Sequence, residues 1–429
     1  MNKRPESQLR LRTWLLPVLV GLLLVLQLTA PYRGWRILLV GLGGMWLLSY
    51  LWARSLAGGL QLIREMRFGW AQVGDEMVER FTLVNDGWSP ALWVEVVDRS
   101  TLPDYRAGRG TRVSGGRSVR WHTKTVCARR GLFTLGPASL QTGDPFGLYT
   151  VTLHYPASLP LMVLPPIVPL PTIEVSPGGR TGGGRPRANA FERTVSAAGV
   201  REHVPGDSMR WIHWPTSARR DSLFVRLFDG TPASDRWLLL DMEQSVQVGA
   251  GRDATEEHGV ILAASLADRD LRSRWSVGLA AHGEQLVWLP PRGGEAQRWE
   301  ILRALAMVSI GSRSLADVLA RSELGQYASL VIVTPSSDSA WIETLIPLMR
   351  RGVIPTVLLL DPVSFGGAGD QTHIRASLTD LGVAHYVITR DLLDWPEARS
   401  TQQEVWGEAD TGRPTSFRRS RVAWRVLST

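Results

Sequence analysis

The sequence predicts a chain of mixed class, in which a hairpin of two membrane helices precedes an all-β sandwich and a doubly wound α/β domain with a mostly parallel sheet. Two long apolar runs stand near the N-terminus, at residues 14–30 and 37–52. In residues 68–165, apolar and polar side chains alternate with a period of two, which is typical of half-buried strands. From residue 237 onwards, short apolar runs alternate with helical patterns, as they do in parallel sheets.

The two apolar runs are at the short end of the length that a membrane-spanning helix needs. Aromatic side chains stand at their ends, as they do at membrane interfaces (Trp14, Tyr32, Trp35, Tyr50 and Trp52). We therefore expect a transmembrane hairpin at residues 14–52, after a tail at residues 1–13. Basic residues lie mainly outside the hairpin (Lys3, Arg4, Arg10, Arg12, Arg54, Arg64 and Arg67). This distribution predicts a two-pass protein of the inner (cytoplasmic) membrane, with both termini and the bulk of the chain in the cytoplasm.

Residues 68–165 are expected to form an immunoglobulin-like β-sandwich. Phe81 and Leu83 share one face of a predicted strand, and Trp121 lies on the apolar face of another. Prolines and then glycines dominate residues 166–198, which predicts a linker. A basic tail at residues 396–429 is expected to follow the α/β domain. The single cysteine, Cys127, excludes a disulfide framework and is expected to be a buried apolar side chain.

Polar residues end the predicted strands of the α/β domain. Asp241 follows one apolar run, Thr334 ends a second, and Asp361 follows a third. The carboxyl ends of parallel strands lie at one edge of the sheet, where functional crevices usually form. We therefore expect these three side chains to lie near one another.

Residues 199–229, called the signature segment below, combine arginines with bulky aromatic residues and a Pro-Gly-Asp turn. Guanidinium groups stack on aromatic rings and bind carboxylates, so this composition indicates a rigid interaction platform. Its candidate residues are Arg201, Pro205, Gly206, Asp207, Arg210, Trp211, Trp214, Ser217, Ala218 and Arg219. Arg210 and Arg219 are each expected to pair with a carboxylate away from water, with Asp207 and Asp241 as the first candidates.

The pattern R-E-x-x-P-G-D-x-x-R-x-I-x-W-x-x-S-A-R of the signature segment resembles a bacterial family known as domain of unknown function 58. The stretches 130–137, 144–148 and 289–294 resemble the same family. The resemblance, which spans roughly residues 68–361, implies a von Willebrand factor A-like fold for residues 199–395. It also implies partners, namely a MoxR-type AAA+ ATPase and a membrane protein with a transglutaminase-like domain.

The resemblance also raises the possibility of a bound divalent cation. Metal-binding von Willebrand A domains end their first strand in D-x-S-x-S, where this chain has Asp241, Glu243 and Ser245. Glutamate is a hard oxygen donor suited to Mg²⁺, but it is longer than serine and adds a charge. The strand near Val333 also lacks the Asp-Gly that such domains carry. We therefore expect no cofactor, with Mg²⁺ as the alternative.

The sequence favours a protein that binds partners and is not an enzyme. No nucleotide-binding, kinase, zinc-protease or G-x-S-x-G motif occurs. Nucleic acid is not expected as a partner, because the arginines are scattered among acids although the net charge is +8. The expected function is that of a membrane-anchored cytoplasmic adaptor, which couples the ATPase to an envelope-associated target. The alternatives are a cation-dependent ligand-binding domain and a hydrolase using residues such as His203, Asp207, Ser208, His213 or Ser217.

Overall fold

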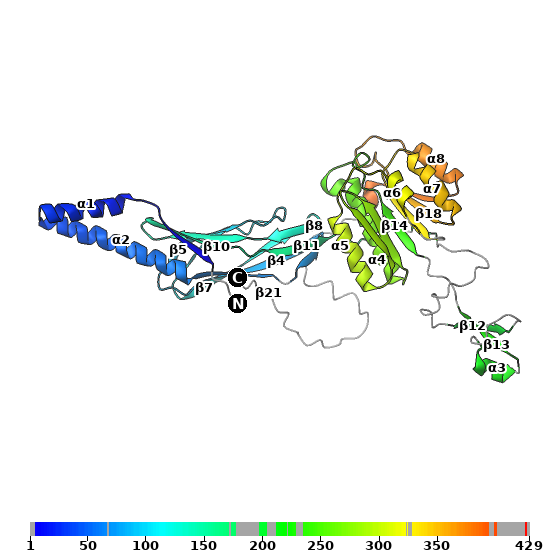
Figure 1. Ribbon diagram of the computed structural model, residues 1–429, viewed down its shortest axis with the longest axis horizontal. Helices are drawn as coiled ribbons and strands as arrows, with labels where there is room; N and C mark the ends of the chain where they lie inside the picture. The colour runs from blue at the N-terminus through cyan, green and yellow to red at the C-terminus, as the bar shows by residue number, and fades with distance from the viewer. Residues whose placement is uncertain are drawn as a thin grey trace. The chain divides into compact units, whose positions relative to one another are not determined.

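The computed structural model describes residues 5–66, 68–170, 173–176, 197–203, 212–220, 222–228, 235–322, 324, 328–393, 399–400 and 425–426. The chain divides into two compact units. The first comprises Met1–Pro165 with Trp395–Thr429, and the second is Pro166–Asp394 (Figure 1). The chain is of mixed α/β class, with antiparallel sheets in the first unit and a mostly parallel sheet in the second. Each unit is described by itself.

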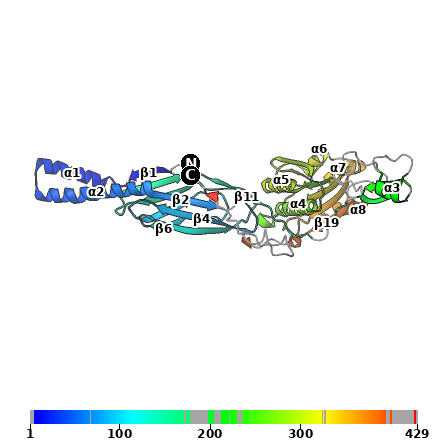
Figure 2. The same ribbon diagram turned by 90° about the horizontal axis from the view of Figure 1, so that it is seen from below.

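The first unit begins with two apolar helices that lie side by side, α1 (Leu15–Thr29) and α2 (Arg33–Gly59), as Figures 1 and 2 show. Most of their large apolar side chains are exposed. By length and composition, α2 could cross a membrane, whereas α1 is a shorter apolar helix. The second helix extends beyond the predicted residues 37–52 because its last turns are packed: Ala53 and Leu56 are fully buried in the core of the β-strands.

Mainly antiparallel sheets form the rest of the first unit, in which β11 pairs with β3 in parallel. One sheet has the strand order β1-β10-β9-β5-β6, and a second contains β4 between β2 and β7. A small third sheet has the order β3-β11-β8. The strands are β1 (Glu6–Leu11), β2 (Leu60–Met66), β3 (Trp70–Gln72), β4 (Asp75–Asn85), β5 (Ala91–Asp98), β6 (Arg109–Val113), β7 (Arg117–Val126), β8 (Gly131–Leu135), β9 (Ala138–Gly143), β10 (Tyr149–Tyr155) and β11 (Leu159–Leu164). Phe81, Leu83, Leu140 and Leu153 are fully buried in their common core.

The two ends of the chain contribute strands to this unit. Residues 6–11, predicted to be part of a tail, pair with β10 from Glu6 opposite His154 to Leu11 opposite Tyr149. Near the C-terminus, β20 (Arg399–Ser400) pairs with β4, and β21 (Arg425–Val426) pairs with β2. Strands before and after the two apolar helices therefore belong to one β unit.

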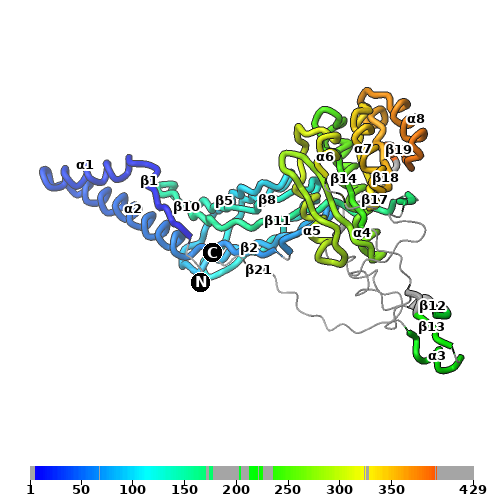
Figure 3. The backbone as a smooth tube through the Cα atoms, turned by 45° about the vertical axis from the view of Figure 1, so that its right-hand side comes forward, coloured from blue at the N-terminus to red at the C-terminus, as the bar shows by residue number. Residues whose placement is uncertain are grey.

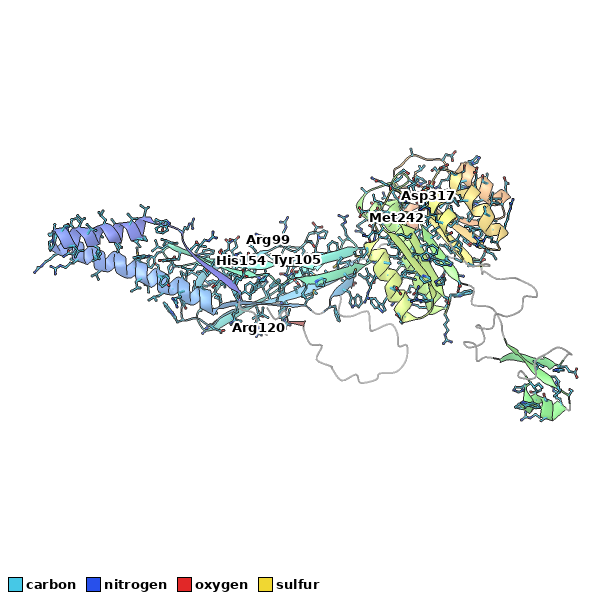
Figure 4. All side chains as sticks on the ribbon, viewed as in Figure 1. Arg99, Tyr105, Arg120, His154, Met242 and Asp317 are labelled. Atoms are coloured by element: carbon cyan, nitrogen blue, oxygen red, sulfur yellow. The ribbon has the colours of Figure 1, made fainter. Side chains whose placement is uncertain are left out.

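A buried ionic cluster links β2, β4 and the end of β5. The Arg64 guanidinium donates to both carboxylate oxygens of Glu79, with Nε–Oε1 at 3.0 Å and Nη2–Oε2 at 2.8 Å. Its Nη1 lies 2.9 Å from Asp98 Oδ1. The Tyr105 hydroxyl donates to Glu79, and Figure 4 shows Tyr105 within the strands. Burial, and then the charge of Glu79, raise the pKa of Tyr105, so that it remains a donor.

The second unit contains a six-stranded sheet of order β16-β15-β14-β17-β18-β19, which is parallel except for β16. The strands are β14 (Arg236–Leu240), β15 (Val277–His282), β16 (Leu286–Arg292), β17 (Ser329–Thr334), β18 (Ile354–Leu360) and β19 (Ala384–Ile388). The helices are α4 (Thr255–Arg272), α5 (Glu295–Met307), α6 (Leu315–Arg321), α7 (Ala340–Arg350) and α8 (Thr372–Asp380), with short 3₁₀ turns at Gly251–Asp253 and Arg390–Leu392. The predicted alternation of apolar strands and helices is confirmed.

Alternate residues of β14 point to opposite faces of this sheet, as the geometry of a strand requires. Leu239 packs in the core formed with α6, α7 and α8. Leu240 lies against Gly259 of α4: a Cβ added to Gly259 would stand 2.9 Å from Cδ1 of Leu240. The two layers of helices on the sheet can be followed in Figure 3. Val168 and Ile173, in the stretch predicted to be a linker, are buried, and Val168 N–H donates to Ser265 Oγ of α4 at 3.0 Å.

Candidate functional site

The described part of the signature segment is a hairpin with a short helix. Strand β12 (Ala197–Glu202) pairs antiparallel with β13 (Phe224–Phe228), and Ile212 forms an isolated bridge with Val225 on β13. Helix α3 (Trp214–Arg220) lies between the two strands in sequence. Ile212 and Val225 are buried, so this small structure has an apolar contact of its own.

Ser217 joins α3 to β13. Its hydroxyl accepts from Phe224 N–H at 2.8 Å and donates to the His213 carbonyl at 3.1 Å. The His213 ring lies at the start of the helix, with Nδ1 2.7 Å from Thr216 Oγ1 and 3.3 Å from Thr216 N. The His213 ring thus accepts from a backbone amide at the helix start, as a capping residue does, whereas the Ser217 hydroxyl satisfies an amide of β13. Their hydrogen bonds are structural and supply no activated nucleophile.

The outer surface of α3 carries the exposed candidates. Trp214 is 65% exposed, and Ala218 and Arg219 are exposed as well. Arg220, also exposed, stacks over the Phe224 ring at 5.6 Å. The prediction that Arg219 occupies a desolvated site is therefore wrong. The helix has only seven residues, of which Ser217 is the buried one.

The other predicted platform residues divide into two groups. Arg201 lies on β12, for which only the backbone is described. Pro205, Gly206, Asp207, Arg210 and Trp211 lie outside the described residues, as does Ser208. The expected pairing of Arg210 with a carboxylate therefore stays a prediction.

Ser217→Ala is expected to destabilise the signature segment. The change leaves the partly buried Phe224 N–H without its acceptor, and the loss of such a hydrogen bond costs about 0.5–1.5 kcal/mol. Hydrogen exchange of the Phe224 amide in the full chain should become faster by the corresponding factor. Ser222→Ala is the matched control, because the Ser222 hydroxyl makes only a long contact, 3.4 Å, to the Arg220 carbonyl. Unchanged exchange in Ser217→Ala would contradict the assigned role.

A second set of candidates meets at the carboxyl edge of the parallel sheet. Asp241, 3% exposed, follows β14, and its Oδ2 accepts from the Thr334 hydroxyl at the end of β17 at 2.6 Å. Its Oδ1 accepts from Glu243 N–H at 3.1 Å. Burial raises the pKa of Asp241 to about 6, although these two hydrogen bonds oppose the shift and the charge of Glu243 adds to it. Figure 4 labels the next residue, Met242, at this edge.

The expected neighbours of Asp241 are partly confirmed. Thr334 lies beside it, as predicted for two adjacent strand ends. Asp361 ends β18 one strand further along, where its own Oδ1 accepts from Val363 N–H. Among the described residues, no arginine is paired with Asp241, whose hydrogen bonds go to a hydroxyl and a backbone amide. Within the described residues, the groups that hydrogen-bond to the Asp241 carboxylate are therefore neutral.

Gln371 is the edge residue that sequence reasoning missed. Its Nε2 lies 3.1–3.2 Å from the carbonyl oxygens of Pro335, Ser336 and Leu360, and thereby connects the ends of β17 and β18. The side chain is 7% exposed. A single glutamine before a helix carries no signal in the sequence that would reveal this role.

The geometry does not fit a divalent cation as it stands. Glu243 and Ser245 bond to each other, with Ser245 Oγ 2.5 Å from Glu243 Oε1, and both Asp241 oxygens already accept protein hydrogen bonds. Within the described ranges, no group of three or more His, Cys, Asp or Glu side chains could hold a metal ion. Hard cations require several converging oxygens, so these residues do not form a ready ligand set.

The fold and its exposed helix define a mixed α/β protein with an antiparallel β unit, a mostly parallel sheet and a separate signature hairpin. Residues 199–345 match the family described as "Protein of unknown function DUF58". The matched range includes the signature segment and the sheet edge at Asp241.

The relatives are bacterial proteins whose names state no function. "Uncharacterized protein YeaD" of Bacillus subtilis is 32% identical over 142 residues, covering 32% of this chain and 34% of that protein. "Uncharacterized protein Rv1480" of Mycobacterium tuberculosis is 25% identical over 170 residues, covering 38% of this chain and 54% of its own length. The chain thus spans about a third to a half of these relatives.

Among solved structures, proximal thread matrix protein 1 from the mussel byssus is similar at a TM-score of 0.26. The two chains are 13% identical, and the match covers 37% of this chain and 42% of that one.

Proposed function

We propose that this protein is a membrane-anchored cytoplasmic adaptor, not an enzyme, and that helix α3 presents a partner-binding surface. The observation that carries the proposal is the exposure of both Trp214 and Arg219 on a helix that Ser217 joins to β13. Trp and Arg are the residues most enriched among those that dominate binding energy. A fixed backbone under them reduces the entropy lost on binding.

Helices α1 and α2 supply the anchor in this proposal, as a two-pass transmembrane hairpin of the inner membrane. Their exposed apolar surface is far more than a soluble unit normally leaves uncovered. Strand β1 precedes α1 and β2 follows α2, and both belong to the same unit of strands. Such an arrangement supports a hairpin whose two ends lie on one side, and the basic residues favour the cytoplasmic side.

Two finer assignments accompany the proposal. The β unit is assigned as an immunoglobulin-like sandwich, which its common core between antiparallel sheets supports. The second unit is assigned as von Willebrand factor A-like, which the strand order and the single antiparallel edge strand support. The family resemblance then suggests the partners, a MoxR-type AAA+ ATPase and a membrane protein with a transglutaminase-like domain.

The geometry favours the adaptor over both alternatives. A cation-dependent domain needs converging oxygens, but Asp241, Glu243 and Ser245 are hydrogen-bonded among themselves and to their neighbours. A hydrolase needs a free nucleophile beside a base, but the Ser217 hydroxyl bonds to backbone atoms on both sides. The proposal accordingly includes no cofactor.

Arg219→Glu is expected to weaken capture of a purified MoxR-type ATPase by the full chain in lipid nanodiscs. The change reverses an exposed charge on the helix that carries Trp214 without touching a buried contact, so the loss of affinity should be about tenfold or more, or ~1.4 kcal/mol, with thermal stability unchanged. Arg375→Glu makes the same change on exposed α8 and is the matched control. Equal binding by both variants and the wild type would contradict the assigned surface.

A further inference from the structure

The apolar helices join the β unit through a set of specific contacts. Arg12 N–H, three residues before α1, donates to the Leu148 carbonyl at 2.7 Å. On α2, the Trp46 indole donates to the Tyr149 hydroxyl at 2.7 Å, and the Trp52 indole donates to the Pro90 carbonyl at 3.1 Å. The loops at residues 86–90 and 144–148 are thereby fixed beside the base of the helical hairpin.

These contacts limit the length of hairpin that extends beyond the β unit. Helix α1 has 15 residues, which at 1.5 Å per residue is about 22 Å. The part of α2 from Arg33 to Trp46 spans about 20 Å by the same rise. The hydrocarbon core of a bilayer is about 30 Å thick. The free part of the hairpin is therefore too short to cross it if the β unit stands away from the lipid.

Exposed aromatic side chains lie on or next to the segments that these contacts join. We call Trp14, Trp88, Trp93 and Phe146 the interfacial ring; they are 70%, 62%, 45% and 50% exposed. Trp14 immediately precedes α1, and Trp88 packs edge-on against Trp52 of α2 at 5.6 Å. Aromatic rings with one apolar and one polar side concentrate at the lipid headgroups.

Hydrogen bonds and a glycine turn fix the loop that carries Phe146. The Asp144 side chain is buried and accepts from the Phe146 and Tyr149 amides, at 2.9 and 2.5 Å. Gly147 adopts φ +71°, which suits glycine in such a turn. This loop leaves half of the Phe146 side chain exposed. Trp93 lies close by, with a ring carbon 3.4 Å from the position that a Cβ on Gly143 would occupy.

We propose that the interfacial ring inserts into the headgroup region of the bilayer, so that the β unit lies directly against the membrane. This inference rests on the proposed anchor and deepens it. With the ring at the headgroups, the parts of the chain at the base of the hairpin also lie within the membrane, and they supply the span that α1 and the free part of α2 lack. Arg10 and Arg12, both exposed beside the ring, are placed to contact lipid phosphates.

Depth-dependent quenching in proteoliposomes tests the proposal. Single cysteines replace Trp88 and Phe146, with Leu22 of α1 as the anchor control and Leu132 of β8 as the remote control; Leu92 is the substitute position if a ring variant misfolds. All five side chains are at least half exposed, and β8 lies at the end of the β unit away from the helices (Figures 1 and 3). Cys127 is fully buried, and burial with the nearby Asp75 raises its pKa to about 12, so a maleimide fluorophore labels only the new thiol.

The vesicles consist of phosphatidylcholine and phosphatidylglycerol, with nitroxide on the headgroup or deep in the acyl chain. Headgroup nitroxide should reduce the fluorescence at positions 88 and 146 several-fold and leave position 132 unchanged, while position 22 responds to the deep nitroxide. If position 22 is quenched but 88 and 146 behave like 132, the ring is not at the lipid, although the anchor stands. If position 22 is not quenched, the anchor fails and the ring proposal fails with it.

Discussion

Arg64→Met is expected to lower the free energy of unfolding of the β unit by about 3–5 kcal/mol. The guanidinium binds Glu79 through two hydrogen bonds and Asp98 through a third, and all three side chains are at most 5% exposed. Methionine fills a similar volume, but it leaves two buried carboxylates with no cation between them. Removing one member of such a pair costs far more than the pair itself contributes, because the remaining charges stay desolvated.

Arg80→Met provides the control on the next strand. Arg80 lies 3.5 Å from Glu65 and is 35% exposed, so water screens the pair, and its loss should cost less than about 1 kcal/mol. Urea unfolding of the full chain in detergent, followed by hydrogen exchange of β2 and β4, reports the β unit separately from the second unit. Equal stability of the two variants would show that the Arg64 cluster is open to water.

The same cluster shows what a strand pattern reveals and what it hides. Alternation predicted the strands of the β unit, and Phe81, Leu83 and Trp121 are buried as their period indicated. Arg64 was read as one of the basic residues after the hairpin, because a charged residue at an apolar position is indistinguishable from a surface residue until its partners are known. Those partners, Glu79 and Asp98, lie 15 and 34 residues away.

The termini show a second limit of local patterns. Residues 6–11 alternate apolar and polar side chains only at Leu9, Arg10 and Leu11, which is too short a pattern to predict a strand, and they pair with β10, more than 130 residues later. By contrast, the parallel sheet was predictable, because strands buried on both faces must be continuously apolar. The carboxyl edge followed from that topology, which brought Asp241 beside Thr334.

The chemistry of that edge was less predictable than its position. The arginines of the signature segment suggested an ionic partner for Asp241, since a buried carboxylate usually needs one. The structure supplies a hydroxyl and an amide, which hydrogen-bond the carboxylate without neutralising it. On α3, the exposed Arg219 is available to a partner instead. This separation of roles is what an adaptor with a rigid core and an external contact surface requires.

Asp241→Asn is expected to remove a pH dependence from the stability of the second unit. The folded pKa of Asp241, about 6, lies above the value of about 3.9 for an unfolded aspartate. Between about pH 4 and pH 6 the folded chain therefore keeps a proton that the unfolded chain has lost. The free energy of unfolding should fall as pH rises through this window, by about 2–3 kcal/mol in all, and change no further above it. Asparagine preserves the side-chain shape and carries no charge at any pH.

Chemical unfolding of both proteins at pH 4 and pH 7, read from hydrogen exchange of β14 and β17, measures this effect. The stability of Asp241→Asn relative to wild type should be about 2–3 kcal/mol greater at pH 7 than at pH 4, because only the wild type has then ionised a buried group. Asp361→Asn, at the half-buried start of the loop after β18, controls for the loss of one carboxylate. A cation held by Asp241 would reverse the sign at pH 7: added Mg²⁺ would stabilise wild type by about 2.7 kcal/mol at a hundredfold excess over Kd and leave the variant unchanged. That outcome would favour the cation-dependent alternative over the adaptor, because a bound cation would compensate the charge that the Thr334 hydroxyl and the Glu243 amide leave in place.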